Sequence, residues 1–255
     1  MFGFVKNVRN SNIVSHEAKL QNHQNFSINE FEYLYNYIPD AYCESMHINN
    51  MVKQYVHDNN IDQLLDLGCG DGNMRGFLKE EKPHLEYTGI DVFECERMPA
   101  EDFKTFDGVN IPLSDQSFDC IFSKQVLEHV EHLSLLIKDV YRVLKPGGVF
   151  LGSCAGLEPL NGHSLFNLTP IGLNVILKQA NLTLLRLYPG TMVDTLMEWH
   201  LKTRVLGNQN SDFGESRFFK QIDSARDILN NEKEVNYYKL IFSGHINFIA
   251  QKQST

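Results

Sequence analysis

The chain has 255 residues, 42% of them hydrophobic, and a formal net charge of −9. This size suits one α/β domain with a cap or insertion and leaves little room for two equal domains. The negative charge argues against nonspecific binding to the phosphate backbone of a nucleic acid, so we expect no nucleic-acid partner. Five scattered cysteines without a C-x-x-C pair, and no apolar run of membrane-spanning length, predict a cytoplasmic protein with no membrane span.

The first sixty residues are expected to form an arm and a helical cap. Residues 1–29 are polar and show no sustained period, which predicts irregular structure or a loosely attached arm. Residues 42–58 place apolar side chains at roughly helical intervals. This pattern predicts an amphipathic helix that precedes the first strand.

The stretch 64–72, LLDLGCGDG, joins an apolar run to three glycines. It predicts a strand buried on both faces, then a glycine-rich loop whose backbone can lie directly against a ligand, then a helix. Such loops also introduce dinucleotide sites, but the third glycine of G-x-G-x-x-G falls on Asn73. Asp66 lies inside the strand, where a carboxylate would face a cationic group rather than a pyrophosphate.

Residues 85–90 read as a second strand that ends at Asp91, about twenty residues beyond the glycine loop. An acidic side chain at this place can accept hydrogen bonds from both hydroxyls of a ribose. We therefore expect Asp91 to bind a nucleoside.

Several motifs resemble one known family. LDLGCGDG resembles the first motif of the class I S-adenosylmethionine (SAM)-dependent methyltransferases, and FKTFDGVNIPLSDQSFDCIFSKQVLEHV and RVLKPGG are similar to the motifs that follow it. The resemblance covers about residues 62–154. It implies an α/β fold with a doubly wound, seven-stranded, mostly parallel sheet, and SAM as the cofactor.

In the family pattern, Asp107 accepts from the adenine amine, Gly108 offers a backbone amide to the ring, and residues 123–125 lie under the methionine part of SAM. The resemblance implies cofactor contacts from Asp66, Gly68, Cys69, Gly70, Gly72, Asp91, Val92, Asp107, Gly108, Ser123 and Gln125.

A hydroxyl or protonated amine acceptor needs a base, and neutral imidazole serves near pH 7, so His129 and His163 are the catalytic candidates. Gln125, Glu128 and His129 are spaced i, i+3 and i+4 at the start of an expected helix over residues 126–144, so they would share one helical face. With His163 they are similar to a metal-binding E-x-x-E-H arrangement of some methyltransferases. Gln125 is a weak neutral ligand, however, and we expect no divalent metal.

The rest of the chain completes the expected sheet. Residues 149–153 predict a fifth strand, Thr169 and Pro170 an N-cap and first turn of a helix, and residues 181–188 a sixth strand. Residues 239–251 predict a seventh, antiparallel strand. The predicted domains are an arm and cap (1–60), a SAM-binding core (61–188), a helical insertion (189–238) and a last core strand (239–255).

The insertion serves either as a lid over the acceptor, which we favour slightly, or as a dimer contact, which leaves a homodimer open. The expected activity is methyl transfer to an oxygen or nitrogen of a small or medium-sized metabolite, sugars and lipid-linked acceptors included. A SAM-binding scaffold without catalysis is the alternative. A nicotinamide oxidoreductase is disfavoured by Asn73 and Asp66.

Overall fold

The computed structural model describes residues 30–44, 47–158, 161–208, 214–229 and 231–254. The arm predicted over residues 1–29 lies outside them. The chain divides into two compact units, Met1–Asn36 and Tyr37–Thr255. Helix α2 (Glu30–Leu34) belongs to the first unit, and the short helix η1 (Tyr35–Tyr37) ends at the first residue of the second. Everything that follows concerns the second unit.

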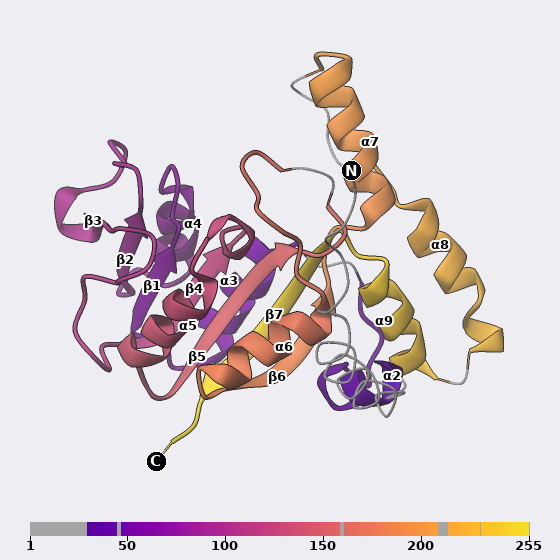
Figure 1. The fold of residues 1–255 in the computed structure, drawn as a ribbon, viewed down its shortest axis with the longest axis horizontal. Coiled ribbons are helices and arrows are strands. Elements are labelled where there is room, and N and C mark those ends of the chain that lie inside the picture. The colour runs from indigo at the N-terminus through magenta and orange to yellow at the C-terminus, as the bar shows by residue number, and fades with distance from the viewer. Residues whose placement is uncertain (1–29, 45–46, 159–160, 209–213, 230, 255) are drawn as a thin grey trace, which may run out of the picture. The chain divides into compact units, whose positions relative to one another are not determined.

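One seven-stranded sheet, in the order β3-β2-β1-β4-β5-β7-β6, forms the centre of this unit (Figure 1). Strands β1 to β5 pair in parallel, and β7 runs antiparallel between β5 and β6. The strands are β1 (Gln63–Leu67), β2 (Glu86–Asp91), β3 (Phe103–Thr105), β4 (Phe118–Lys124), β5 (Leu144–Ala155), β6 (Leu182–Pro189) and β7 (His245–Lys252). The predicted doubly wound, mostly parallel sheet is confirmed.

Strand β1 lies between β2 and β4, and its side chains Leu64, Leu65 and Leu67 are completely buried. Burial on both faces explains why its sequence is a continuous apolar run rather than an alternating one. The parallel strands β1, β2 and β4 end at the same edge of the sheet, where the glycine loop begins.

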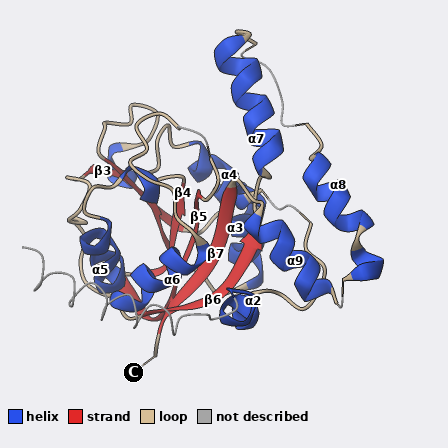
Figure 2. Ribbon diagram, turned by 45° about the vertical axis from the view of Figure 1, so that its right-hand side comes forward, coloured by secondary structure: helices blue, strands red, loops and turns tan. Residues whose placement is uncertain are grey.

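Helices cover both faces of the sheet (Figure 2). They are α3 (Ile48–Asp58), α4 (Asn73–Glu81), η2 (Ala100–Asp102), η3 (Leu127–His129), α5 (Leu133–Val143) and α6 (Pro170–Gln179). Helix α3 confirms the predicted amphipathic helix, since it buries Ile48, Met51, Val52 and Val56. The predicted start of α6 is also confirmed, because Thr169 Oγ1 accepts from the Gly172 amide at 3.0 Å and Pro170 follows it.

Two predicted elements were wrong. The helix expected from Val126 is broken: Gln125 has a left-handed backbone (φ 53°), a single tight turn covers Leu127–His129, and α5 begins at Leu133. The i, i+3, i+4 spacing of the residues from Gln125 to His129 therefore does not put them on one helical face.

The strand expected over residues 239–251 begins only at His245. Its first part belongs to helix α9 (Glu232–Ile241), whose N-cap Asn231 accepts from the Glu234 amide at 3.0 Å. Lys239 is completely buried in this helix and pairs with Asp223 at 2.8 Å. An ion pair with a distant residue thus stabilises helix where the local apolar pattern favoured strand.

The segment between β6 and β7 is helical, as expected, and projects beyond the end of the sheet in Figure 1. It contains α7 (Val193–His200), η4 (Leu201–Val205), α8 (Arg217–Ser224), η5 (Arg226–Ile228) and α9. None of the helices described here is long and apolar enough to cross a membrane.

Candidate cofactor-binding and active site

A cleft of about 470 Å³ opens at the carboxyl ends of β1, β2 and β4. This edge is where ligands bind in open α/β sheets. The cleft brings together seven residues singled out from the sequence: Gly68, Asp91, Val92, Asp107, Gly108, Gln125 and His129.

Gly68, the first residue of the glycine loop, lines the cleft, and the loop needs glycines for its backbone conformation. Gly68 has φ 75°, and its amide donates to the Ile90 carbonyl at 2.8 Å. A Cβ at Gly68 would lie 2.3 Å from Cγ2 of Val126. Gly72, also with φ 75°, is the N-cap of α4. Both positions therefore exclude a larger residue without strain or displacement of a neighbour.

Asp91, the last residue of β2, is tied to the glycine loop. Its Oδ2 accepts from the Gly70 amide at 2.9 Å and its Oδ1 accepts from the Phe93 amide at 3.2 Å. The loop thus holds the carboxylate at the cleft wall, with lone pairs left on both oxygens.

Asp107 closes a tight turn after β3. Its Oδ1 accepts from the amides of Val109 and Asn110, and its Oδ2 from the Asn110 side chain at 2.6 Å. The Asn110 side chain, and then these amides, lower the pKa of Asp107. The next residue, Gly108, has φ 86°. The carboxylate is thus kept ionised and fixed beside a backbone that only glycine adopts easily.

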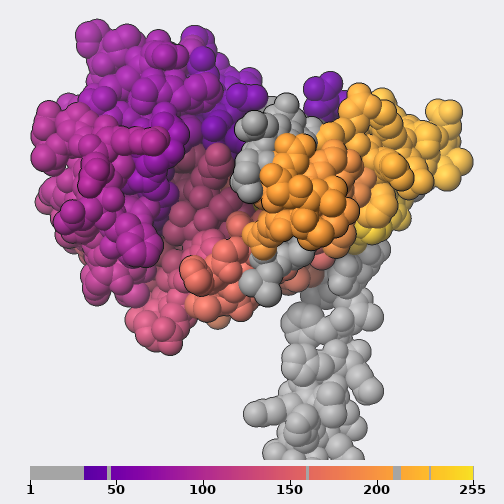
Figure 3. Space-filling view, turned by 90° about the horizontal axis from the view of Figure 1, so that it is seen from above, coloured from indigo at the N-terminus to yellow at the C-terminus, as the bar shows by residue number. Residues whose placement is uncertain are grey.

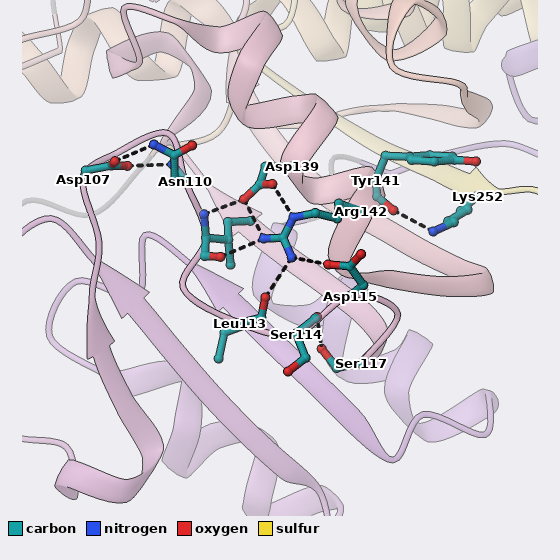
Figure 4. A network of polar contacts seen from close by, with 11 residues as sticks. Asp107, Asn110, Leu113, Ser114, Asp115, Ser117, Asp139, Tyr141, Arg142 and Lys252 are labelled. Atoms are coloured by element: carbon teal, nitrogen blue, oxygen red, sulfur yellow. Dashed lines mark hydrogen bonds and ion pairs between the residues drawn. The ribbon is translucent and has the colours of Figure 1, made fainter.

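Arg142 anchors the loop that follows this turn, a role that the sequence did not reveal (Figure 4). Its guanidinium donates to both carboxylate oxygens of Asp139, at 2.6 and 2.9 Å, and to Asp115 at 2.6 Å. It also donates to the carbonyls of Ile111 and Leu113. RVLKPGG indicated only the end of a helix, whereas its arginine joins α5 to this loop.

Asp66, Cys69 and Ser123 do not line the cleft but lie buried next to it. Oδ2 of Asp66 accepts from the Tyr87 hydroxyl at 2.5 Å. Burial raises the pKa of Asp66 to about 7, although the bond from Tyr87 lowers it. The Ser123 hydroxyl is buried without a hydrogen-bond partner among the described residues. Direct cofactor contacts from these three stay predictions.

The two histidines named as catalytic candidates differ in position. His129 lines the cleft, while His163 is exposed in the loop after β5 and lies outside the cleft. Glu128, next to His129 in the chain, is completely buried, and this burial raises its pKa. The described residues contain no group of three His, Cys, Asp or Glu side chains that could hold a metal ion.

Phe93 lines the cleft but was not singled out from the sequence. Phe93 lies two residues after Asp91 and is 79% exposed, and an aromatic residue just beyond the end of a predicted strand was a usable signal. Lys124, the last residue of β4, also lines the cleft and lies within the segment 123–125 that the resemblance placed under the methionine part of SAM.

Comparison with known proteins agrees with this geometry. Residues 65–152 match the model of a methyltransferase domain. Over 107 residues the chain is 32% identical to the phthiotriol/phenolphthiotriol dimycocerosates methyltransferase of Mycobacterium tuberculosis, a match that covers 39% of each protein. The chain therefore spans about two fifths of the length of this curated relative.

Solved structures extend the similarity to most of the fold. The [4+2]-cyclase SpnF matches with a TM-score of 0.55 and 17% identity, covering 86% of this chain and 87% of that one. A SAM-dependent methyltransferase from Archaeoglobus fulgidus matches with a TM-score of 0.54 and 18% identity, covering 80% and 93%. Residues 65–152 are therefore similar to a methyltransferase domain, and the sheet order gives the chain the class I, Rossmann-like methyltransferase fold.

Proposed function

We propose that this protein uses SAM to methylate an oxygen or nitrogen atom of a small or medium-sized metabolite. The observation that carries the proposal is the contact between the Gly70 amide and Asp91 at the wall of the cleft. It joins the glycine loop to the carboxylate that binds ribose hydroxyls in folds of this type.

The cleft fits SAM in volume and in chemistry. Its volume of about 470 Å³ suits a nucleoside-sized ligand. Apolar side chains, among them Val92, Phe93 and Val126, offer walls for the adenine ring, and Asp91 and Asp107 offer acceptors for the ribose and the adenine amine. Gly68 allows the backbone to approach the methionine part.

When bound, SAM supplies a methyl group on a positively charged sulfur, and this charge is lost on transfer. The protein therefore needs mainly to align the two reactants and exclude water. His129 lines the cleft, which supports it as the base that accepts a proton from an acceptor hydroxyl or ammonium. His163 remains a second candidate, for which movement of its exposed loop would be required.

The matched relative supports lipid-like metabolites among the first acceptors to test, because its name assigns it phthiotriol dimycocerosates. All five cysteines are free thiols, which supports a cytoplasmic location. A helical lid formed by the insertion would cover the acceptor.

A second candidate is a SAM-binding protein that does not transfer methyl groups. The likeness to SpnF favours it, because that protein is a [4+2]-cyclase on the same fold.

Turnover separates the two candidates. Purified protein is incubated with SAM and pools of small metabolites, and S-adenosylhomocysteine and methylated products are measured by mass spectrometry. We expect S-adenosylhomocysteine and one methylated compound to form in equal amounts, and the Gly68→Ala variant to form neither product. SAM binding without any product favours the second candidate, and no SAM binding contradicts both.

A further inference from the structure

A smaller pocket of about 190 Å³ adjoins the cofactor cleft and shares Lys124 and Gln125 with it. Its floor follows one row across three neighbouring strands, since Lys124 of β4 pairs with Ser153 of β5, and Ser153 with Asn247 of β7. The pocket thus lies one step further along the sheet edge than the glycine loop, away from Asp91.

The opposite side of the pocket leads toward the helical insertion. It shares His47 and Thr191 with an outer cavity of about 500 Å³, which Ser216 and Phe219 of the α8 region also line. In the space-filling view, the first half of the sheet (indigo to magenta) and the insertion (orange) stand on either side of recessed middle strands (Figure 3). A methyl acceptor must approach from a side that the cofactor does not occupy, and this pocket offers such a route.

One ammonium, that of Lys124, and two imidazoles, those of His47 and His245, line the pocket in a protein whose net charge is negative. Lys124 is half-buried, and no hydrogen bond or ion pair joins its ammonium to another described residue. His47 lies at the N-terminus of α3, where its Nδ1 accepts from the Asn49 amide at 3.3 Å, and His245 begins β7. Burial, then Lys124 and His245, lower the pKa of His47.

The acidic groups nearby offset only part of this charge. Glu158 is buried and lies 3.2 Å from Nε2 of His245 and 3.1 Å from Nε2 of His200. Burial alone would raise the pKa of Glu158, but the two imidazoles lower it, so the carboxylate balances His245. Asp66 and Asp71 act on Lys124 only through space. Partial burial of an ammonium without a contacting anion has a free-energy cost, and a bound anion would reduce that cost.

We propose, building on the function above, that this pocket is the acceptor subsite and that Lys124, His47 and His245 bind an oxyanion of the acceptor. A carboxylate and a phosphate share the required chemistry. Ser153 and Asn247 add neutral polar groups, whereas a quaternary or primary ammonium would meet the charge of Lys124. The acceptor is therefore an acid or a phosphate ester rather than a simple amine.

The test uses the full chain with S-adenosylhomocysteine bound and titrates inorganic phosphate and, separately, acetate. The histidine ring NMR signals of His47 and His245 are followed, together with those of exposed His84 as an internal reference. We expect both pocket signals to move with one common Kd while His84 stays unchanged. Lys124→Met should raise this Kd at least tenfold, because a charge-assisted contact is lost. The matched control is Lys138→Met, an exposed lysine of α5.

A response to phosphate alone indicates that the acceptor carries a phosphate ester, and a response to acetate alone indicates a carboxylate. A response to both anions means that the pocket accepts either group. Unmoved pocket signals, or equal Kd values in the two lysine variants, overturn the proposal. A loss of S-adenosylhomocysteine affinity in Lys124→Met as large as the loss for phosphate also overturns it, because Lys124 then holds the cofactor's own carboxylate. Failure of the unaltered chain to bind S-adenosylhomocysteine contradicts the proposed function instead, and a parallel titration without cofactor still decides the pocket.

Discussion

The two halves of the sheet edge are built differently. On the side of β1, β2 and β4, the site is made of backbone: glycines with left-handed conformations, and carboxylates held by loop amides. On the side of β5 and β7, the small pocket is made of side chains that come from distant parts of the chain, such as His47 and His245. The first half is therefore defined by its backbone conformation, and the second half by the chemistry of its side chains.

This difference explains what could be predicted. A turn or a strand end determines the position of each of Gly68, Gly72 and Asp91. Because these causes are local, the sequence predicted these positions as well as the sheet. Lys124 and His245 line one pocket only because β4 and β7 lie on either side of β5, and no local sequence pattern predicts that pairing. The last turn of α9, residues 239–241, was predicted as strand for the same reason, because the helix there depends on the pairing of Lys239 with the distant Asp223.

If the first half depends on backbone shape, the glycines should differ according to their surroundings. Gly68→Ala adds a left-handed strain of about 1–2 kcal/mol and a clash with Val126. Gly70→Ala, with φ 54° and nothing within 4 Å of the added Cβ, carries the backbone strain alone. We expect at least a hundredfold loss of SAM affinity for Gly68→Ala and no more than tenfold for Gly70→Ala, by calorimetry. Equal losses would show that the clash with Val126 is irrelevant.

Two substitutions at Asp91 distinguish the contribution of its charge from that of its contact with the glycine loop. Asp91→Ala removes the ribose acceptor and the partner of the Gly70 amide, so SAM affinity should fall about tenfold or more, the value of one or two charge-assisted hydrogen bonds. Asp91→Asn keeps one carbonyl oxygen and should lose less. Fluorescence-detected SAM titration measures both, and unchanged affinity in Asp91→Ala would remove Asp91 from the site.

Asp66 tests whether a buried carboxylate under the loop costs stability. Its pKa is about 7 in the fold against an ordinary value of 3.8, so the folded state binds the proton more tightly than the unfolded one. The free energy of unfolding should therefore fall as pH rises from about 4 to 7, by up to about 1.4 kcal/mol per pH unit. Asp66→Asn should flatten this slope in urea denaturation. Tyr87→Phe removes a bond that lowers the pKa, and should extend the slope to higher pH.

Arg142 should have the smallest effect, because it acts through the loop and not on the cofactor. Arg142→Lys keeps the charge but loses the planar contact with Asp139, and we expect SAM affinity to fall roughly three- to fivefold. Hydrogen exchange of the Ile111 and Leu113 amides should become faster. A variant with slow exchange and intact affinity would make Arg142 dispensable for the loop.

Calorimetric titration of the purified protein with SAM, and separately with S-adenosylhomocysteine, tests the central claim most directly. A single site for each ligand, with a Kd on the order of micromolar, is the result that a formed glycine loop and a fixed Asp91 predict. Absence of measurable binding for both ligands would contradict the account, because the cleft at β1, β2 and β4 would then not be a SAM site.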